Sequence, residues 1–530
     1  MRLSNILVTL SLVSAAAGCP QPIPGAVVTD PVSITASNGV LRADFVYRTF
    51  VDAYGLRHYC YMYGDTVQAP TLRVHPGDEM VLRLRNELPR SGDLSAPGER
   101  PFPHAHAMEI TGPCGAGRLS AASTNLHFHG MHIAPACHQD DVISTLVQPS
   151  GAWYEYRFKV PKDQPPGLYW YHPHPHGFSE AQVLGGASGA LIVEGIQRVN
   201  PKLAGLGERL LVLRDQVVPG LTEAAEDLGP GKDISLNFVP VMSPIYQPAV
   251  IQVRSGQREF WRVLNASADT YFDLQFRVRT YPQALEMVAL DGVPSLSALL
   301  THVLIPPGGR AEFLVTMPPA LLTQLITRKY DTGPDGESTP YRVIANVEST
   351  QDGPLPASMM LGDSREPVTT PSPLAAAGLA ALKPVRQRKL YFSETHQDSK
   401  DRTSLATYYI TVAGHTPKAF DMDFQKPNII VKQGTVEDWV VENRANEAHA
   451  FHIHQLHFQV MERDRKSTGD PSLRDTIDLP FWDGTGAYPS VKLRMDFRSP
   501  EIAGTFLYHC HILEHEDGGM MGVIRVVSGK

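Results

Sequence analysis

Short stretches in which apolar and polar residues alternate recur along the chain and predict β-strands. Residues 154–158 read Tyr-Glu-Tyr-Arg-Phe, and residues 311–315 read Ala-Glu-Phe-Leu-Val. Alternation places successive side chains on opposite faces of a strand, so that one face can be buried while the other meets water. The 44 Pro and 43 Gly favour many short strands and tight turns over long helices. We therefore expect an all-β protein.

A repeated pattern divides the chain into three similar units. Each copy runs from a Val through a Gly to an Asn nine residues after that Gly, over residues 74–86, 253–265 and 431–443. The glycines of successive copies are 179 and 178 residues apart. A second pattern, bounded by prolines, recurs near residues 149–161, 307–318 and 489–500. Self-similarity at a fixed period indicates copies of one structural unit, and sandwich-type β domains are the natural interpretation.

The repeat and the local composition predict the domain boundaries. We expect β-sandwich domains at residues 40–195, 207–350 and 385–530. Residues 351–384 are rich in Pro, Ala and Ser, which is typical of a linker. The middle domain has no histidine cluster, so we interpret it as a structural spacer that holds the outer two domains together.

The first residues have the pattern of an export signal. Met1 and Arg2 precede an apolar run over residues 6–17, which is too short to span a bilayer. We expect residues 1–18 to be a signal peptide and the protein to be exported, either to a periplasm or outside the cell. Residues 16–19, Ala-Ala-Gly-Cys, resemble a bacterial lipoprotein cleavage box without its usual first Leu, so a lipid anchor at Cys19 stays as the lesser alternative. No later segment is apolar and long enough to be transmembrane.

Charge and composition limit the partners. The formal net charge is -8 over 530 residues, which gives no basic footprint for nucleic acid. The chain is 42% hydrophobic, which supplies material for well-formed cores. We expect a monomer whose partners are small molecules.

The five cysteines are assigned by their surroundings. Cys114 and Cys137 flank one loop-rich region, and we expect them to form a disulfide in an oxidising compartment. Cys19 lies at the cleavage point, and Cys510 is a metal ligand on the arguments below. Cys60 is then expected to be a buried free thiol, the commoner fate of a lone cysteine.

Histidines occur in four His-x-His pairs, which can present two imidazoles on one face of a strand. The pairs are His127 and His129, His172 and His174, His452 and His454, and His509 and His511. Two pairs come from the first unit and two from the third, so we expect the metal between those units. Eight imidazoles exceed the three or four protein ligands of a mononuclear site, and we infer a cluster of several metals. A single His-x-His pair is more often incidental, but four such pairs beside the cysteine motif below reverse that expectation.

The segment around Cys510 has the ligands of a second kind of metal site. Residues 505–508 predict a strand, on which Cys510 faces one way while His509 and His511 face the other. One Cys, two His and a weak thioether form the ligand set of a blue-copper electron-transfer centre. His449, His515 and Met520 complete that set, and the strand would link the two metal sites.

These motifs resemble those of the multicopper oxidases, the family of laccases, bilirubin oxidase and the bacterial cuprous oxidases. The resemblance spans roughly residues 40–530 and rests on residues 126–130, 170–174, 449–454 and 509–520. It implies three consecutive cupredoxin-like domains, each a Greek-key β-sandwich or barrel, with the mononuclear site in domain three. It also implies a trinuclear cluster between domains one and three, and four coppers per chain.

The resemblance assigns each ligand a role. It implies that His449, Cys510, His515 and Met520 bind the type-1 copper, and that His127 and His452 bind the type-2 copper. The type-3 pair would be held by His129, His172, His174, His454, His509 and His511.

The same resemblance implies an oxidase that uses oxygen. Electrons from a reducing substrate would enter at the type-1 copper and pass through Cys510 to His509 and His511, and oxygen would be reduced to water. Protons must reach the buried cluster, and carboxylates are the natural carriers. We predict Asp141 and Glu516 in that role, against the alternative that both are solvated loop acids.

The substrate prediction rests on what the third unit lacks. Cuprous oxidases of the family carry a Met-rich insertion there, whereas residues 351–432 contain only Met359, Met360 and Met422. A laccase-like oxidase of phenols and related aromatics, which would dock beside an exposed edge of His515, is therefore the first expectation. Oxidation of cuprous or manganous ions is the alternative, and a non-catalytic copper-binding protein of the same fold is the third.

Overall fold

The computed structural model describes residues 19–89, 109–112, 114–218, 230–319, 321–356, 358–359, 378–398, 406–420 and 423–528. The predicted signal peptide and most of the predicted linker, residues 351–384, lie outside these ranges. Strands dominate the described residues and helices are few, so the expected all-β class is confirmed. Within the same ranges no helix is long and apolar enough to cross a membrane.

The first unit is a sandwich of two five-stranded sheets. One sheet has the order β10 (Trp153–Lys159), β6 (Glu79–Asn86), β2 (Val40–Val51), β3 (Arg57–Tyr63) and β4 (Val67–Gln68). The other has the order β1 (Ser33–Thr35), β5 (Thr71–Val74), β12 (Gly189–Val193), β11 (Gly167–His172) and β9 (His127–His129). A hairpin of β7 (Glu109–Gly112) and β8 (Gly115–Arg118), and a helix α1 (Ser179–Leu184), lie outside the sheets. Apolar side chains from both sheets, among them Phe45, Leu72, Leu82 and Tyr171, share one buried core.

The second unit follows a short helix α2 (Ile196–Val199) and a 3-10 turn η2 (Pro201–Leu203). Its larger sheet has the order β15 (Val239–Val241), β14 (Lys232–Leu236), β13 (Gly207–Val217), β17 (Arg258–Asn265), β24 (Arg310–Thr316), β20 (Leu285–Leu290) and β21 (Val293–Pro294), with β22 (Leu299–Leu300) and β27 (Ser358–Met359) at its sides. Its second sheet has the order β16 (Ala249–Arg254), β26 (Arg342–Thr350), β25 (Thr323–Arg328), β18 (Phe272–Val278) and β19 (Tyr281–Pro282), with β23 (Val303–Ile305) beside β18.

The third unit repeats the arrangement. One sheet has the order β29 (Ala406–Val412), β28 (Arg386–His396), β31 (Val436–Asn443), β37 (Ser490–Asp496), β33 (Phe458–Arg463) and β34 (Lys466–Ser467), with β35 (Leu473–Arg474) beside β33. The other has the order β30 (Ile429–Lys432), β39 (Met521–Val527), β38 (Gly504–Cys510), β32 (His449–Ile453) and β36 (Thr476–Leu479). A short helix α4 (Leu513–Asp517) connects β38 to β39.

The sequence repeat has a common structural cause in all three units. Gly77, Gly256 and Gly434 each have positive φ (90°, 73° and 87°) in the turn between two strands, a conformation that glycine adopts without steric cost. The asparagine that ends the next strand holds the local loops together. Asn86 donates from Nδ2 to the Ala122 and Val147 carbonyls, at 2.7 and 2.8 Å. Asn265 and Asn443 make the equivalent pairs of bonds in the other two units.

Strand pairing is also shared between the units. In each, one parallel pair joins a long strand to the strand that ends at the repeated asparagine: β2 with β6, β13 with β17, and β28 with β31. The three sandwiches are therefore copies of one topology, as the repeat predicted. The domain boundaries stay predictions, and β1 and β27 extend the sheets beyond residues 40–195 and 207–350.

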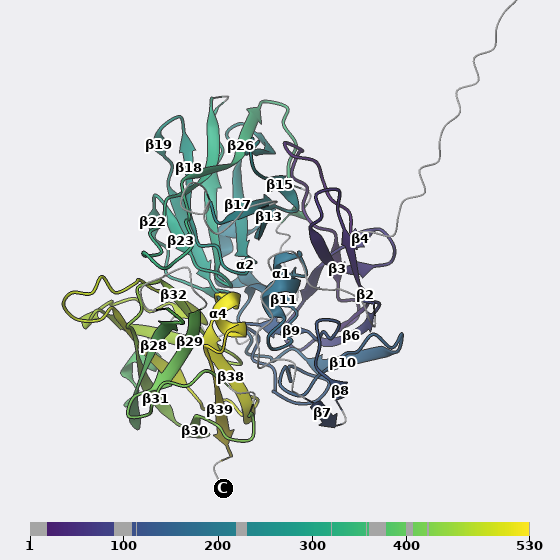
Figure 1. Cartoon of the computed structure of the whole chain (residues 1–530). Helices are drawn as coiled ribbons and strands as arrows, with labels where there is room; N and C mark the ends of the chain where they lie inside the picture. Colours follow the sequence, from purple (N-terminus) through teal and green to yellow (C-terminus); the bar gives the residue numbers. More distant parts are fainter. Residues whose placement is uncertain are drawn as a thin grey trace, which may run out of the picture.

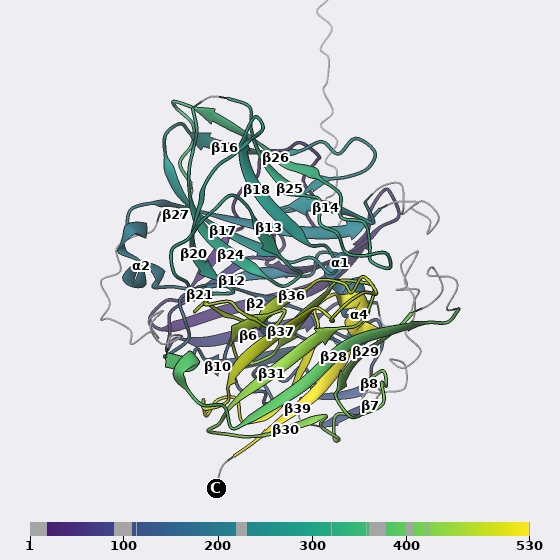
Figure 2. The ribbon, with the colours of Figure 1, turned by 90° about the vertical axis from the view of Figure 1, so that its left-hand side faces the viewer.

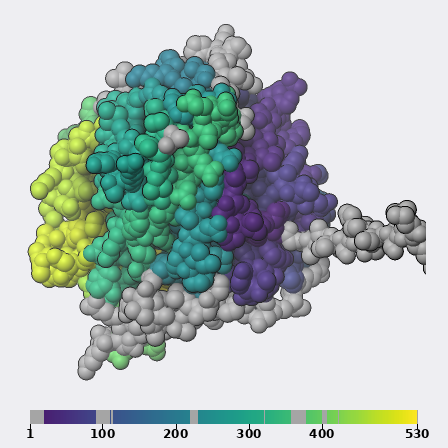
Figure 3. Space-filling model, turned by 90° about the horizontal axis from the view of Figure 1, so that it is seen from above, coloured from purple at the N-terminus to yellow at the C-terminus, as the bar shows by residue number. Residues whose placement is uncertain are grey.

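The three units meet around α4. Figure 1 shows α4 beside α1 at the centre of the molecule, where the first and third units face each other. Asp517 of α4 accepts hydrogen bonds from the backbone N–H groups of Gly177 and Glu180, at 2.8 and 2.9 Å. Leu513 donates its N–H to the Ala268 carbonyl of the second unit, at 3.0 Å. The side view shows the second unit above the third (Figure 2), and from above the second unit's surface lies between those of the other two (Figure 3).

Candidate metal centres

His449, Cys510 and His515 form a compact buried group in the third unit. The Cys510 Sγ lies 3.7 Å from Nδ1 of His449 and 3.7 Å from Nδ1 of His515, and the two Nδ1 atoms are 3.0 Å apart. Ligands that share one metal at bond lengths near 2.0–2.3 Å lie roughly 3–4 Å from one another. The described geometry therefore fits a single metal ion held by one thiolate and two imidazoles.

Met520 lies in the same core as Cys510 and is fully buried. Its backbone N–H donates to the His515 carbonyl at 2.8 Å, and its own carbonyl accepts from the Cys510 N–H at 3.1 Å. These two bonds fix the backbone of Met520 beside both residues, and its thioether stays the predicted fourth ligand of this group.

His515 is enclosed rather than exposed. Only 1% of the residue is accessible, Tyr408 stacks on its ring with centroids 4.2 Å apart, and its Nε2 lies 3.2 Å from Glu447 Oε2. Burial opposes protonation of the imidazole, but the Glu447 carboxylate raises the pKa of His515 well above its usual value. Burial in turn raises the pKa of Glu447 to about 7. The exposed edge of His515 on which the phenol prediction relied is therefore covered.

The eight histidines of the four His-x-His pairs meet between the first and third units. In the first unit β9 pairs with β11, so that His127 stands opposite His172. In the third unit β32 pairs with β38, and His452 stands opposite His509. All eight side chains are buried.

Within this cluster the ring nitrogens gather in groups whose candidate ligand atoms all lie within 4.8 Å of one another. The groups are His129 with His172 and His511, His174 with His454 and His509, and His127 with His129 and His452. The shortest contacts between rings are Nε2 of His454 to Nε2 of His509, at 3.1 Å, and Nε2 of His511 to Nδ1 of His129, at 3.3 Å. Two of these groups share His129 and the third shares no residue with them, so the histidines fit several metal ions and not one.

Buried ring nitrogens that lack a hydrogen-bond partner indicate whether metal ions fit here. Nε2 of His127, His172 and His452 is buried and has no hydrogen-bond partner among the described atoms. Buried polar atoms are otherwise almost always paired, so these three require a ligand. Burial also lowers the pKa of His172 and His452 well below the usual value, and neutral imidazole is the form that binds metal. The residues present therefore fit bound copper.

The strand β38 links the two centres. Cys510 lies in the mononuclear group, while its neighbours His509 and His511 lie in two different groups of the cluster. Alternation along a strand sends the cysteine to one face and the two histidines to the other, as the sequence predicted. His509 Nδ1 also donates to the Cys510 carbonyl at 2.8 Å, which fixes its ring.

Asp140, and not the predicted Asp141, reaches the cluster. Asp140 Oδ1 lies 3.0 Å from Nδ1 of His127 and accepts the Phe128 N–H at 2.9 Å, while Oδ2 accepts from Gln455 at 2.6 Å. Asp141 instead accepts the Ser144 N–H at 3.0 Å and bonds to the Ser144 hydroxyl. Of these two neighbouring acids, Asp140 therefore contacts a histidine of the cluster, whereas the carboxylate of Asp141 bonds to Ser144.

Glu516 lies where the sequence predicted, beside the cluster. Its carboxylate oxygens are 3.4 Å from His174 Nε2 and 3.2 Å from His509 Nδ1, and neither oxygen makes a hydrogen bond to a described group. Burial raises the pKa of Glu516 well above its usual range. It is thus an enclosed acid that can hold a proton, and not a solvated loop residue.

The middle unit reaches the cluster, which the spacer interpretation missed. Arg310 of β24 makes a bidentate ion pair with Asp475 of the third unit, at 2.8 and 2.5 Å. Asp475 Oδ1 lies 3.1 Å from Nε2 of His129, and its carbonyl accepts from Nδ1 of His452 at 2.9 Å. A carboxylate that holds the remote nitrogen of a ligand fixes the ring and its tautomer. No local motif marks Arg310 or Asp475, because their roles arise only when the units pack.

Both remaining pairs of cysteines are disulfides. Cys114 and Cys137 are bonded, which confirms that prediction. Cys60 is bonded to Cys19, with the Cα atoms 5.9 Å apart, so the prediction of a free Cys60 was wrong. Cys19 was set aside as a cleavage residue, although the fold brings it against β3. Its sulfur is occupied in this structure, which also counts against a lipid anchor there.

Comparisons with known proteins point to one family. Two family models described as multicopper oxidase match residues 118–198 and 391–530. A multicopper oxidase of Staphylococcus epidermidis is 24% identical over 88% of this chain and 83% of its own length. A laccase of Haloferax volcanii is 23% identical over 85% of this chain and 75% of its own length. The solved structure of a multicopper oxidase from Campylobacter jejuni, described as a metallo-oxidase, has the same fold, with a TM-score of 0.67, 21% identity and 96% coverage of both chains.

Proposed function

The chain belongs to the multicopper oxidase family, and we propose that it couples one-electron oxidation of a small reducing substrate to the four-electron reduction of O2 to water. Membership makes it a copper-dependent oxidoreductase that uses oxygen. The substrate, the number of coppers and the roles of the residues below are parts of the proposal. The export of the protein and its domain boundaries are also parts of the proposal. The two disulfides support export, because disulfides persist in oxidising compartments.

The ligand assignment follows the geometry of the two groups. His449, Cys510, His515 and Met520 would hold a type-1 copper, and the eight clustered histidines would hold a type-2 ion and a type-3 pair. Copper bound there would supply stepwise acceptance of single electrons and their delivery to O2. The protein holds the ligands rigid, keeps bulk water away from them and brings protons to the buried cluster.

One observation carries the proposal: a single strand delivers Cys510 to one group and its two neighbours to the other. Neither the mononuclear group nor the histidine cluster alone would require Cys510 to lie between His509 and His511. The test is oxygen uptake by the copper-loaded protein with a one-electron donor, together with copper counting. We expect about four coppers per chain, an intense blue colour, and water instead of peroxide as the product. A colourless protein that consumes no oxygen with any donor would refute the proposal.

Asp140 is the proposed proton carrier on the side of His127. We expect Asp140→Asn to slow steady-state oxygen reduction about 100-fold or more, because an amide holds the same position but cannot carry a proton. Anaerobic reduction of the blue copper by the donor should stay fast. The measurement pairs steady-state oxygen uptake with stopped-flow bleaching of the blue colour.

Asp141→Asn is the matched control, since it removes a neighbouring carboxylate that contacts only Ser144 in the described structure. It should leave the rate within about twofold of wild type. If both variants slow oxygen uptake equally, the effect does not depend on the contact between the carboxylate and His127. If Asp140→Asn instead loses copper, its role is to position His127.

Met520→Leu should keep the copper and the colour while raising the reduction potential of the mononuclear site. A thioether donates electron density that stabilises the oxidised metal, and leucine does not. We expect a rise on the order of 60 mV, which is tenfold in a one-electron equilibrium constant. Redox titration of the blue absorbance measures it. An unchanged potential would mean that Met520 is no axial ligand.

For the electron donor, two candidates follow from different observations. The sequence favours a phenol, because thioethers that would capture cuprous ions are scarce. The walls around His515 favour a metal cation, because carboxylates and hydroxyl groups surround it. A panel of phenols, manganous, ferrous and cuprous ions, compared by kcat/KM at matched concentrations, discriminates between them.

A further inference from the structure

Two of the four His-x-His pairs continue into a third histidine. Residues 127–132 and 452–457 both read His-x-His-x-x-His. The same backbone turn occurs in both segments, because the residue directly after the second histidine has positive φ, 82° at Gly130 and 60° at Gln455. The proposed copper sites use only the first two histidines of each segment, so the third histidine of each has no assigned role.

The fold brings these two third histidines, His132 and His457, together. Nε2 of His132 lies 2.6 Å from Nδ1 of His457, and the ring centroids are 4.8 Å apart. His132 comes from the first unit and is half-buried, whereas His457 comes from the third unit and is only 4% exposed. Ring nitrogens of the proposed copper ligands approach each other in a similar way, at 3.0 Å between His449 and His515. The contact therefore resembles pairs of histidines that would share a metal ion.

The second ring nitrogen of His457 is held as in a metal ligand. Nε2 donates to the Asp291 carbonyl of the second unit at 2.9 Å, which leaves a lone pair on Nδ1 facing His132. Among the cluster ligands, Nδ1 of His172 and Nδ1 of His452 likewise donate to backbone carbonyls at 2.9 Å and leave Nε2 available for copper. A carbonyl in this position fixes the tautomer and the ring orientation of a ligand histidine.

The surroundings favour neutral rings and a bound cation. Burial, together with the ring of His457, lowers the pKa of His132 to about 3. Burial also lowers the pKa of His457, despite the nearby Asp475. Neutral imidazole is the form that binds metal. The carboxylates of Asp163 and Asp475 favour a positive charge at the pair, whereas Arg310 opposes it. A metal ion can supply a charge that the rings themselves do not carry.

The two nitrogens are closer than a shared ion requires, and a hydrogen bond between neutral rings would also account for their contact. An ion bound at about 2.0–2.1 Å to both nitrogens in tetrahedral geometry needs them roughly 3.3 Å apart. A small rotation of the half-buried His132 ring supplies the difference, and its exposed side admits water to complete the coordination. Because the site has two protein ligands instead of the four of a structural zinc site, the ion should exchange with solution.

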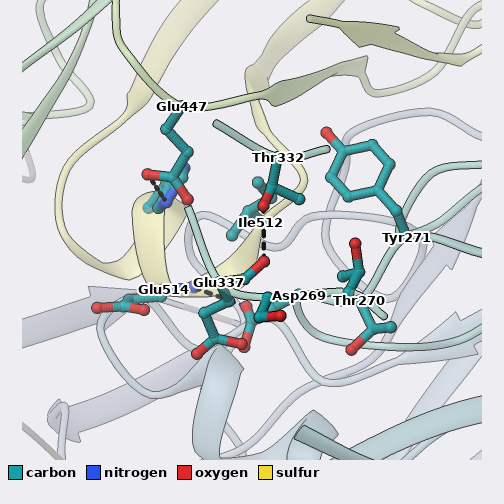
Figure 4. A pocket seen from close by; sticks show the side chains of 11 residues that line it. Asp269, Thr270, Tyr271, Thr332, Glu337, Glu447, Ile512 and Glu514 are labelled. Carbon is teal, nitrogen blue, oxygen red and sulfur yellow. Dashed lines mark hydrogen bonds and ion pairs between the residues drawn. The ribbon is translucent and has the colours of Figure 1, made fainter. Parts of the chain in front are cut away.

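We propose that His132 and His457 bind a divalent transition-metal ion that prefers imidazole, such as zinc or cupric ion, and that this ion joins the first unit to the third. The bond from His457 to the Asp291 carbonyl means that the second unit braces the junction. The site is separate from the cavity beside His515 (Figure 4), whose described lining residues include neither histidine. It requires no turnover and does not depend on the oxidase function proposed above.

Zinc is the probe, because it can be counted separately from the copper that the protein already holds. The copper-loaded protein is brought to equilibrium with Zn²⁺ by dialysis, over a range of zinc concentrations. We expect one zinc ion per chain whose affinity falls at least about tenfold in His132→Gln and in His457→Gln, since even a group that only orients a ligand typically contributes that much. Zinc should also raise the unfolding temperature of the wild type more than that of either variant, because an ion bound only by the folded state stabilises it.

His138→Gln is the matched control, because His138 is an exposed histidine of the first unit whose Nδ1 contacts the Glu155 carbonyl at 2.6 Å. It should bind zinc as the wild type does. A cooperative unfolding transition without zinc shows that a variant is folded. If the wild type binds no zinc, or if folded His132→Gln or His457→Gln binds it unchanged, the inference is overturned and the rings share only a hydrogen bond. Equal weakening in His138→Gln would assign the zinc to surface histidines and would overturn it as well.

Discussion

Cys510→Ser is expected to abolish both the blue colour and the oxidase activity. The Cys510 Sγ lies 3.7 Å from Nδ1 of both His449 and His515, and a serine hydroxyl is a poor replacement for a thiolate ligand. The backbone that joins residue 510 to His509 and His511 would remain. Without the cysteine thiolate, however, no ligand at residue 510 would pass electrons from the mononuclear site into it. Turnover should fall by roughly a thousandfold or more, or about 4 kcal/mol in activation free energy.

Copper counting separates this loss from general unfolding. The variant should bind one copper fewer than the wild type, because the eight histidines of the cluster are untouched. Its cluster should still react with oxygen when it is reduced chemically in a single turnover. A blue or normally active Cys510→Ser protein would contradict the assignment of Cys510, and loss of all copper would show that the two centres cannot fill independently.

Arg310→Met is expected to cost both stability and copper at the cluster. Arg310 is fully buried and bridges three units: its Nε donates to the Leu168 carbonyl at 3.1 Å, and its guanidinium forks onto Asp475. Burial opposes ionisation of Asp475, but Arg310 more than compensates and holds the pKa of that carboxyl below its usual range. Removal of one partner of a buried pair leaves an uncompensated charge, at a cost of about 3–5 kcal/mol.

The loss should extend to the metal. Asp475 fixes His129 and His452, so we expect cluster copper to dissociate roughly 10- to 100-fold more readily in Arg310→Met, while the blue colour persists. Thermal unfolding and copper retention during dialysis against a chelator give the two readouts.

Arg262→Met supplies a matched control for that experiment. Arg262 is as deeply buried as Arg310 and pairs with Glu208 and Glu312, neither of which is a cluster ligand or contacts Asp475 in the described structure. It should lower the unfolding temperature by a comparable amount and retain its copper. Equal loss of copper in both variants would mean that Arg310 acts through stability alone.

Local pattern was sufficient for much of the fold and for the ligand sets. The repeated Gly and Asn can be recognised in the sequence because each has a local role: the Gly forms a turn with positive φ, and the Asn side chain binds the loops beside it. His-x-His pairs are visible because a strand needs only two residues to present two rings on one face. The same alternation is enough to place Cys510 and its two neighbours on opposite faces from their order in the chain alone.

Residues that act through tertiary contacts could not be found in this way. Asp475 approaches His129 across 346 positions, and Arg310 approaches Asp475 across 165. Contacts between residues so far apart in the chain produce no local sequence pattern. Asp140 was missed for a different reason, since a turn of two consecutive acids gives no indication of which one faces the metal. The pairing of Cys19 with Cys60 was missed because chain position suggested processing, whereas β3 brings the two sulfurs together.

Because the cluster lies between the first and third units, its ligands are complete only late in the synthesis of the chain. His129 and His511 share one group of ligands although 382 positions separate them. A ribosome that adds about 5–20 residues per second needs roughly 20–80 s between these two histidines. A growing or truncated chain that stops before β38 has the histidines of β9 and β11 but neither complete centre. Metal insertion is therefore expected only after β38 and Met520 have been synthesised, and a chain cut before β38 would have neither centre complete.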